Sequence, residues 1–141
     1  MKIDSSLEIN GEFPPIEQRE LTRLICEQFW YDGELKDSAN VVHLYVDNHW
    51  FRLYFDCGII FWREQSAAPE PYSYLDNTAT KVEFRLHNLL TEIGVESCLI
   101  VSVEASEISG GSMVKIALSS GTVIEFKDVA DVSSYSTQQI A

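Results

Sequence analysis

The sequence predicts an α+β fold of αβββ-αβββ order: two helix-plus-three-strand units that form a mainly antiparallel sheet with the helices packed on one face. Two segments carry apolar residues at helical spacing, three short alternating runs follow each of them, and turn residues separate the runs. With 141 residues, 45% of them hydrophobic, the chain is expected to form a single domain over 1–141.

The first helix is expected at about 15–30. Leu21, Leu24, Ile25 and Phe29 share one helical face, and Pro14-Pro15 suits a first helical turn, where a missing N–H is not needed. Asp32-Gly33 would end the helix.

Strands are expected at about 41–46, 49–55 and 59–64. A two-residue turn at Asp47-Asn48 opposes Val46 to His49, and a three-residue turn at 56–58 opposes Leu53 to Phe61 and Arg52 to Trp62. One face then carries Val42, Leu44, Val46, Phe51, Leu53, Phe55, Ile59 and Phe61, which is the expected core face.

A proline-rich connection at 65–79 leads to a second expected helix at 81–93. Leu86, Leu89 and Ile93 follow the helical period, and Gly94 stands where a helix would stop. A strand is the competing interpretation, because Val82, Phe84 and Leu86 also alternate with charged residues.

Three further strands are expected at about 98–106, 113–118 and 122–128, followed by a tail at 133–141. A three-residue turn that ends on Gly121 opposes Ile116 to Ile124 and Val114 to Phe126. A shift of 63 residues lays 51–58 on 114–121, which suggests two pseudo-repeated halves at about 14–64 and 80–130, although any two amphipathic hairpins share such a pattern.

The net charge of -12 disfavours nucleic acid as a partner. This charge favours a basic protein as the partner, or it only keeps the protein soluble. Three widely spaced cysteines without a Cys-x-x-Cys pair, together with the lack of a signal-like N-terminus, predict a soluble cytoplasmic protein with reduced thiols and no membrane association.

No catalytic, metal or cofactor site is predicted. His43, Asp47, His49, Asp56 and Cys57 are close in sequence, but His43 and His49 would project from opposite faces of their hairpin. Arg85 and His87 are expected on a solvated face, and Gly110-Gly111 at a hairpin tip.

The predicted binding surface is the second face of the first three strands. Aromatic residues and arginine are typical interface anchors, and arginine across from tryptophan suits a cation–π contact. Two alternatives are that a helix or loop covers this face, with Tyr72 and Tyr74 of the connection as the candidate cover, and that it forms a small-ligand pocket. The surface consists of Tyr45, Trp50, Arg52, Tyr54 and Trp62.

The second half, from about Phe84 to Phe126, has an apolar strand, a polar tip and then the run from Val114 to Phe126. In this spacing it resembles small acidic bacterial proteins of unknown function or of toxin-immunity type. The resemblance implies a non-enzymatic role, such as inhibition of a toxin by covering its active site, and carries over no site residue. We therefore expect an interaction protein, with a small-ligand binder or enzyme and a homo-oligomer subunit as alternatives.

Overall fold

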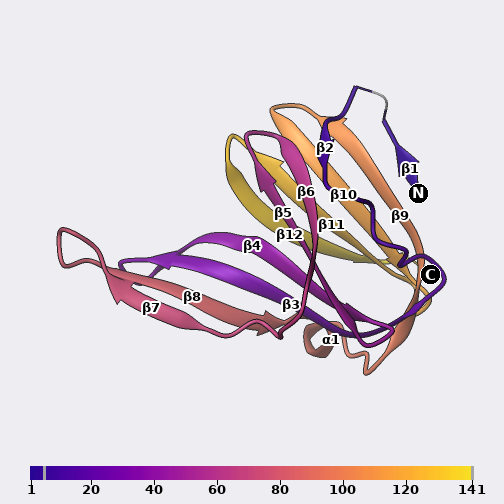
Figure 1. Cartoon of the computed structure of the whole chain (residues 1–141), viewed down its shortest axis with the longest axis horizontal. Helices are drawn as coiled ribbons and strands as arrows, with labels where there is room; N and C mark the ends of the chain where they lie inside the picture. The colour runs from indigo at the N-terminus through magenta and orange to yellow at the C-terminus, as the bar shows by residue number, and fades with distance from the viewer. Residues whose placement is uncertain (5, 141) are drawn as a thin grey trace.

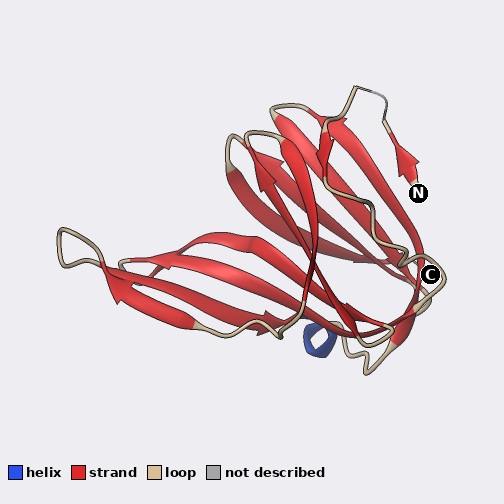
Figure 2. Cartoon of the chain, in the orientation of Figure 1, coloured by secondary structure: helices blue, strands red, loops and turns tan. Residues whose placement is uncertain are grey.

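The computed structural model describes residues 1–4 and 6–140, and these residues are almost entirely β-structure (Figure 2). They contain twelve strands and a single four-residue helix. The predicted α+β fold with helices packed on a sheet face is therefore wrong. The elements are β1 (Lys2–Ile3), β2 (Ile9–Asn10), β3 (Glu20–Tyr31), β4 (Glu34–Val46), β5 (His49–Asp56), β6 (Ile59–Gln65), β7 (Tyr72–Leu75), β8 (Lys81–Asn88), α1 (Leu89–Glu92), β9 (Cys98–Ile108), β10 (Gly111–Leu118), β11 (Thr122–Val129) and β12 (Val132–Gln139).

The first expected helix is the long strand β3. Leu24, Ile25 and Cys26 are all buried, because both faces of this strand are covered, so the simple alternation of a half-buried strand is missing. Asp32-Gly33 is not a helix end but a hairpin turn between β3 and β4, with φ angles of 51° and 77°.

The second expected helix is strand β8 followed by the one-turn helix α1. Val82, Phe84 and Leu86 lie on one face of the strand, as in the competing interpretation. The Asn88 side chain accepts from the Thr91 N–H and caps α1. Gly94, at φ 75°, ends the helix as expected, with its N–H donating to the Thr91 carbonyl.

The strands pair in the order β12-β11-β10-β9-β3-β4-β5-β6-β2. Strand β3 is the junction: its first residues pair with β9, the remainder pairs with β8 on the same edge, and β4 occupies the other edge. The sheet folds over at β3, so β9–β12 form one layer and β3–β6 the other (Figure 1). Side chains from both layers share one core, which includes Leu24, Leu44, Leu53, Trp62, Val103, Ile116, Ile124 and Phe126.

At both sides of the core, further strand pairs or hydrogen bonds link the edges of the two layers. On one side β2 runs parallel to β6, β1 runs parallel to β9, and the Gln18 N–H donates to the Ile100 carbonyl. On the other, the backbone N–H groups of Ser133 and Tyr135 donate to the side chains of Asp37 and Ser38. These bonds join β12 to a stretch of β4 that does not pair with β5.

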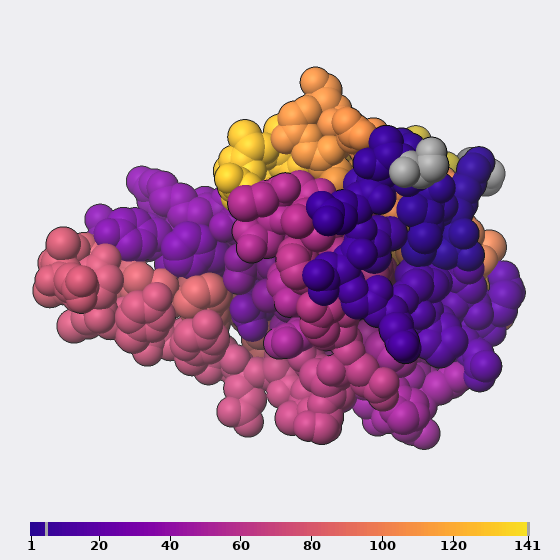
Figure 3. Space-filling view, turned by 45° about the horizontal axis from the view of Figure 1, so that its top comes forward, coloured from indigo at the N-terminus to yellow at the C-terminus, as the bar shows by residue number. Residues whose placement is uncertain are grey.

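Beyond this core the sheet continues as an arm of four strands in the order β4-β3-β8-β7 (Figure 1). It includes the hairpin ends at Asp32-Gly33 and at 76–80. The space-filling view shows the arm extending away from the rest of the molecule (Figure 3). The arm is a single layer.

Candidate functional site

Four of the five predicted binding residues share one face of the sheet. Tyr45, Trp50, Arg52 and Tyr54 lie on the outer face of β4 and β5, which is the face turned away from the core. Trp62 does not join them: it is 1% exposed and belongs to the core cluster.

The turn between β5 and β6 explains the position of Trp62. It has two residues, Cys57 and Gly58, with φ angles of 52° and 77°, so Asp56 pairs with Ile59. The predicted three-residue turn is wrong, and a one-residue change of register reverses the face of every side chain in β6. Leu53 is therefore opposite Trp62, and no Arg52–Trp62 contact forms.

The outer face of β3–β6 carries a set of stacked arginine and aromatic side chains that we call the arginine surface. The Arg23 guanidinium lies 5.0 Å from the Trp50 ring centre, and Arg52 lies 5.6 Å from that of Tyr54. Sequence reasoning missed the members from β3 and β6, because it placed β3 in a helix and shifted β6. The arginine surface consists of Arg23, Tyr45, Trp50, Arg52, Tyr54, Phe61 and Arg63.

A second group of aromatic residues covers the outer face of the arm, and we call it the arm surface. Three rings stack across three strands: Phe29 and Phe84 are 5.4 Å apart, and Phe84 and Tyr72 are 4.5 Å apart. Tyr72 and Tyr74 are 54% and 52% exposed. The arm surface consists of Phe29, Tyr31, Tyr72, Tyr74, Phe84 and Leu86.

Carboxylates border the arm surface. Glu27 is the register partner of Leu86 and so lies on this face. Burial, and then the charge of Glu27, raise the pKa of the Tyr72 phenol. At the tip, the Asp76 carboxylate accepts from the Tyr31 hydroxyl at 2.9 Å, and Glu34 is opposite Tyr31.

The basic side chains of the arm are paired. Lys36 bonds to Glu34 at 3.0 Å. Arg85 and Lys81 lie on the opposite face of β8, where both approach Glu83, and Arg85 stacks 4.0 Å from the Trp30 ring centre. Arg85, expected on a solvated face of a helix, thus lies instead on an exposed face of a strand.

The connection between β6 and β7 separates the two surfaces. It must pass from one edge of the sheet to the other, because β6 pairs beyond β5 and β7 pairs beyond β8. The Gln65 amide lies 3.0 Å from Nδ1 of His43, and His43, Ile25 and Trp50 are each less than 9% exposed. The middle of the outer face is therefore covered, whereas Arg52 is exposed. The cover does not come from Tyr72 and Tyr74, which lie in β7 and are exposed.

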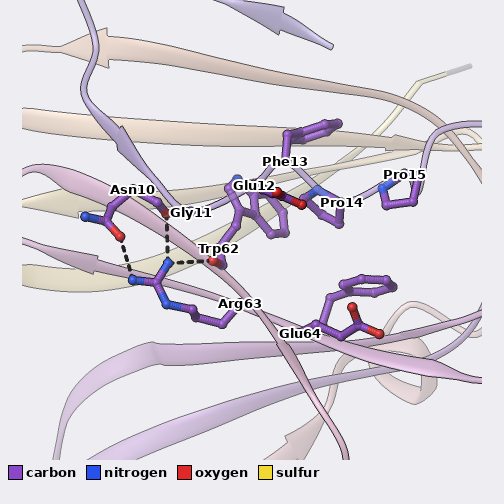
Figure 4. A pocket seen from close by; sticks show the side chains of 10 residues that line it. Asn10, Gly11, Glu12, Phe13, Pro14, Pro15, Trp62, Arg63 and Glu64 are labelled. Carbon is purple, nitrogen blue, oxygen red and sulfur yellow. Dashed lines mark hydrogen bonds between the residues drawn. The ribbon is translucent and has the colours of Figure 1, made fainter.

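A hollow lies at the closure between the N-terminal segment and β6 (Figure 4). Its volume is about 390 Å³, and Phe13, Trp62 and Phe51 form its apolar part. The Arg63 guanidinium is already bonded to the backbone oxygens of Asn10 and Trp62, at 3.1 and 2.8 Å. Arg52 and Tyr54 do not line this hollow, so it does not match the predicted ligand pocket.

The remaining singled-out residues show no reactive arrangement. The hydrogen bond and the charge of Asp56 raise the pKa of the Cys57 thiol, which disfavours the nucleophilic thiolate. His87 bonds to Glu92 at 2.8 Å and stacks on Tyr135. Gly110-Gly111 stands at the hairpin between β9 and β10, as predicted.

His43 and His49 project from opposite faces, as predicted from the two-residue turn at Asp47-Asn48. Within residues 1–4 and 6–140, no group of three or more His, Cys, Asp or Glu side chains is arranged to hold a metal ion. In the same residues no helix has the length and apolar character that crossing a bilayer requires.

Comparison of the chain with protein-family profiles, curated proteins and solved structures gives no match.

Proposed function

We propose that this chain is a non-enzymatic binding protein that recognises a basic protein through the arm surface. The observation that carries the proposal is an exposed aromatic sheet face bordered by carboxylates. Contiguous exposed apolar surface on a folded chain is typical of a binding site.

The exposed tyrosines are the expected anchors of the contact. Tyr72 and Tyr74 are each about half exposed, so a partner would remove apolar ring surface from water. Burial of such surface contributes roughly 25 cal/mol per Å². Tyrosine is also enriched among residues whose truncation weakens a protein interface most.

The charges around the arm surface favour a basic partner. Three carboxylates border it, those of Glu27, Asp76 and Glu34. Each has a partner within the chain: Glu27 lies 3.6 Å from His43, Asp76 accepts from Tyr31, and Glu34 is paired with Lys36. Lysine and arginine side chains of a partner would meet carboxylates and the faces of aromatic rings, and both attract cations. The net charge of -12 would accelerate the encounter with such a partner at low ionic strength.

A more specific form of this proposal is that the chain acts as an inhibitor or an immunity protein. In that role the arm would cover the working surface of a basic target. Its extension beyond the core suits insertion into a groove of another protein (Figure 3).

The test is capture of partners by the tagged full chain from its own host at low salt, with two matched double variants. Tyr72→Ser with Tyr74→Ser removes two exposed rings from the arm. Leu99→Ser with Val101→Ser removes two side chains, each 44% exposed, from β9.

We expect one basic protein that the wild type and the β9 variant retain, that the arm variant loses, and that elutes as salt rises. Equal capture by both variants, or a captured protein that is acidic, would contradict the proposal. Circular dichroism of each variant verifies that the fold is intact.

A further inference from the structure

Two arginines stand directly opposite each other on the outer face of β5 and β6. Arg52 pairs with Arg63 in the ladder, and their Cα atoms are register partners. Like charges directly opposite on neighbouring strands destabilise a sheet. Residues that break a local rule in this way are expected at functional sites.

The two guanidinium groups differ in the hydrogen bonds that they form. Arg63 donates to the Asn10 and Trp62 carbonyls and to the Asn10 side chain. Arg52 forms neither an ion pair nor a side-chain hydrogen bond with the residues that the structure describes, and it is exposed. The next carboxylate along the same face of β5 is Asp56, four residues away, which is roughly 13 Å along a strand.

Aromatic rings support both arginines. Tyr54 and Phe61 stack at 4.9 Å with an interplanar angle of 7°. Arg52 lies 5.6 Å from the Tyr54 ring centre, and Arg63 lies 5.5 Å from that of Phe61. The stacking restricts the guanidinium groups, so binding costs less side-chain entropy.

We propose that Arg52, with Arg63 and the Tyr54–Phe61 stack beside it, is a docking site for the carboxylates of an acidic protein segment. The site is distinct from the arm surface, and it takes a partner region of the opposite charge. The chain has ten basic and twenty-two acidic residues, yet the guanidinium groups of Arg52 and Arg63 are neighbours here, and that of Arg52 has no ion-pair partner among the described residues. A carboxylate would neutralise this local excess of positive charge.

The form of the site favours carboxylate over polymeric phosphate. One guanidinium with free donors matches one carboxylate in a two-pronged hydrogen bond. The stacked rings beside Arg52 offer apolar contact for the neighbouring side chains of a peptide.

The probe is a fluorescein-labelled octapeptide of alternating Glu and Phe, titrated with the full chain at low salt and followed by fluorescence anisotropy. The matched peptide carries Gln in place of Glu. The matched variants are Arg52→Gln and Lys2→Gln, because both remove one exposed positive charge and Lys2 lies in β1, outside the sheet face in question.

We expect the Glu peptide to bind wild type and Lys2→Gln equally, Arg52→Gln to weaken binding about tenfold, and the Gln peptide to bind weakly to all three. Equal affinity of the two variants for the Glu peptide, or equal binding of both peptides, would overturn the proposal. So would no binding of the Glu peptide at concentrations up to about 1 mM, which is the range of weak recognition. Displacement of the peptide by less inorganic phosphate than acetate would reject a carboxylate ligand in favour of phosphate. None of these results depends on the arm, because the arm variant Tyr72→Ser with Tyr74→Ser should bind the Glu peptide like wild type.

Discussion

Replacement of Trp62 by alanine tests the register of β5 and β6, on which the assignment of the arginine surface depends. In the structure Trp62 faces the core, and its neighbour Phe61 faces outward. A three-residue turn at 56–58 would exchange the two positions. The variants Trp62→Ala and Phe61→Ala therefore distinguish the two registers by the order of their effects on stability.

The magnitude follows from the surroundings of each ring. Trp62 is 1% exposed and packs edge-on against Phe13 at 5.6 Å. Removal of a buried Phe or Trp side chain usually costs about 3–5 kcal/mol of unfolding free energy. Among the described residues, the buried Nε1 of Trp62 has no hydrogen-bond partner. Removal of this unsatisfied donor offsets part of the cost, so the expected loss is about 3 kcal/mol. Phe61 is half-buried against Tyr54, so we expect a loss of about 1–2 kcal/mol.

Urea denaturation followed by far-UV circular dichroism measures both values. A domain of this kind is expected to have about 5–15 kcal/mol of stability, so both variants should remain folded without urea. The slope against urea should stay constant, which limits the comparison to stability. A larger loss for Phe61→Ala than for Trp62→Ala would refute the two-residue turn and the composition of the arginine surface.

Three further changes test other parts of the structure. Cys57→Asn should raise stability by about 0.5–1 kcal/mol, since Asn-Gly is preferred where both turn residues have positive φ; a loss would contradict that turn. Gly111→Ala should cost more than about 2 kcal/mol in urea titrations, because a Cβ there would overlap the Asp128 carbonyl oxygen; a neutral result would show that β10 and β11 are farther apart. Hydrogen bonds from the Thr80 N–H and the Thr78 hydroxyl lower the pKa of Asp76 to about 2, below its unfolded value near about 3.9. The Asp76 carboxylate thus stabilises the fold above that unfolded pKa and loses this effect as the pH falls towards 2, so thermal melts should show Asp76→Asn less stable than wild type at pH 7 and equal to it near pH 2.

The prediction of a helix at 15–30 was wrong because both faces of the strand there are buried. In β3 the run Leu24, Ile25, Cys26 faces the core on one side and the crossing connection on the other, so its apolar residues fit a helical period as well as a strand. Two signals in the chain pointed to a hairpin: the aromatic run Phe29-Trp30-Tyr31 and the Asp32-Gly33 pair. A hairpin there would have brought Phe29 and Tyr31 onto a sheet face.

The candidate site was predicted only in its local part. Tyr45, Trp50, Arg52 and Tyr54 share a face because alternation along β5 and the Asp47-Asn48 turn determine it. Membership of Arg23 and Arg63 depends on which strands neighbour β4 and β5. The arm surface combines β3, β7 and β8, which no local pattern brings together.

Local patterns in the chain were therefore enough to predict several elements. These are the strands over 41–64 and 98–128, the Asp47-Asn48 turn, and the pairing of Ile116 with Ile124 across the turn at Gly121. Three features depend on long-range packing: β3 is the junction of two layers, Trp62 lies in the core, and an aromatic face remains uncovered on the arm. The physical reason is that turn chemistry and side-chain alternation act over a few residues. Which face becomes buried depends instead on segments that are distant in the chain, such as the connection over β3 and the N-terminal strands at β6 and β9.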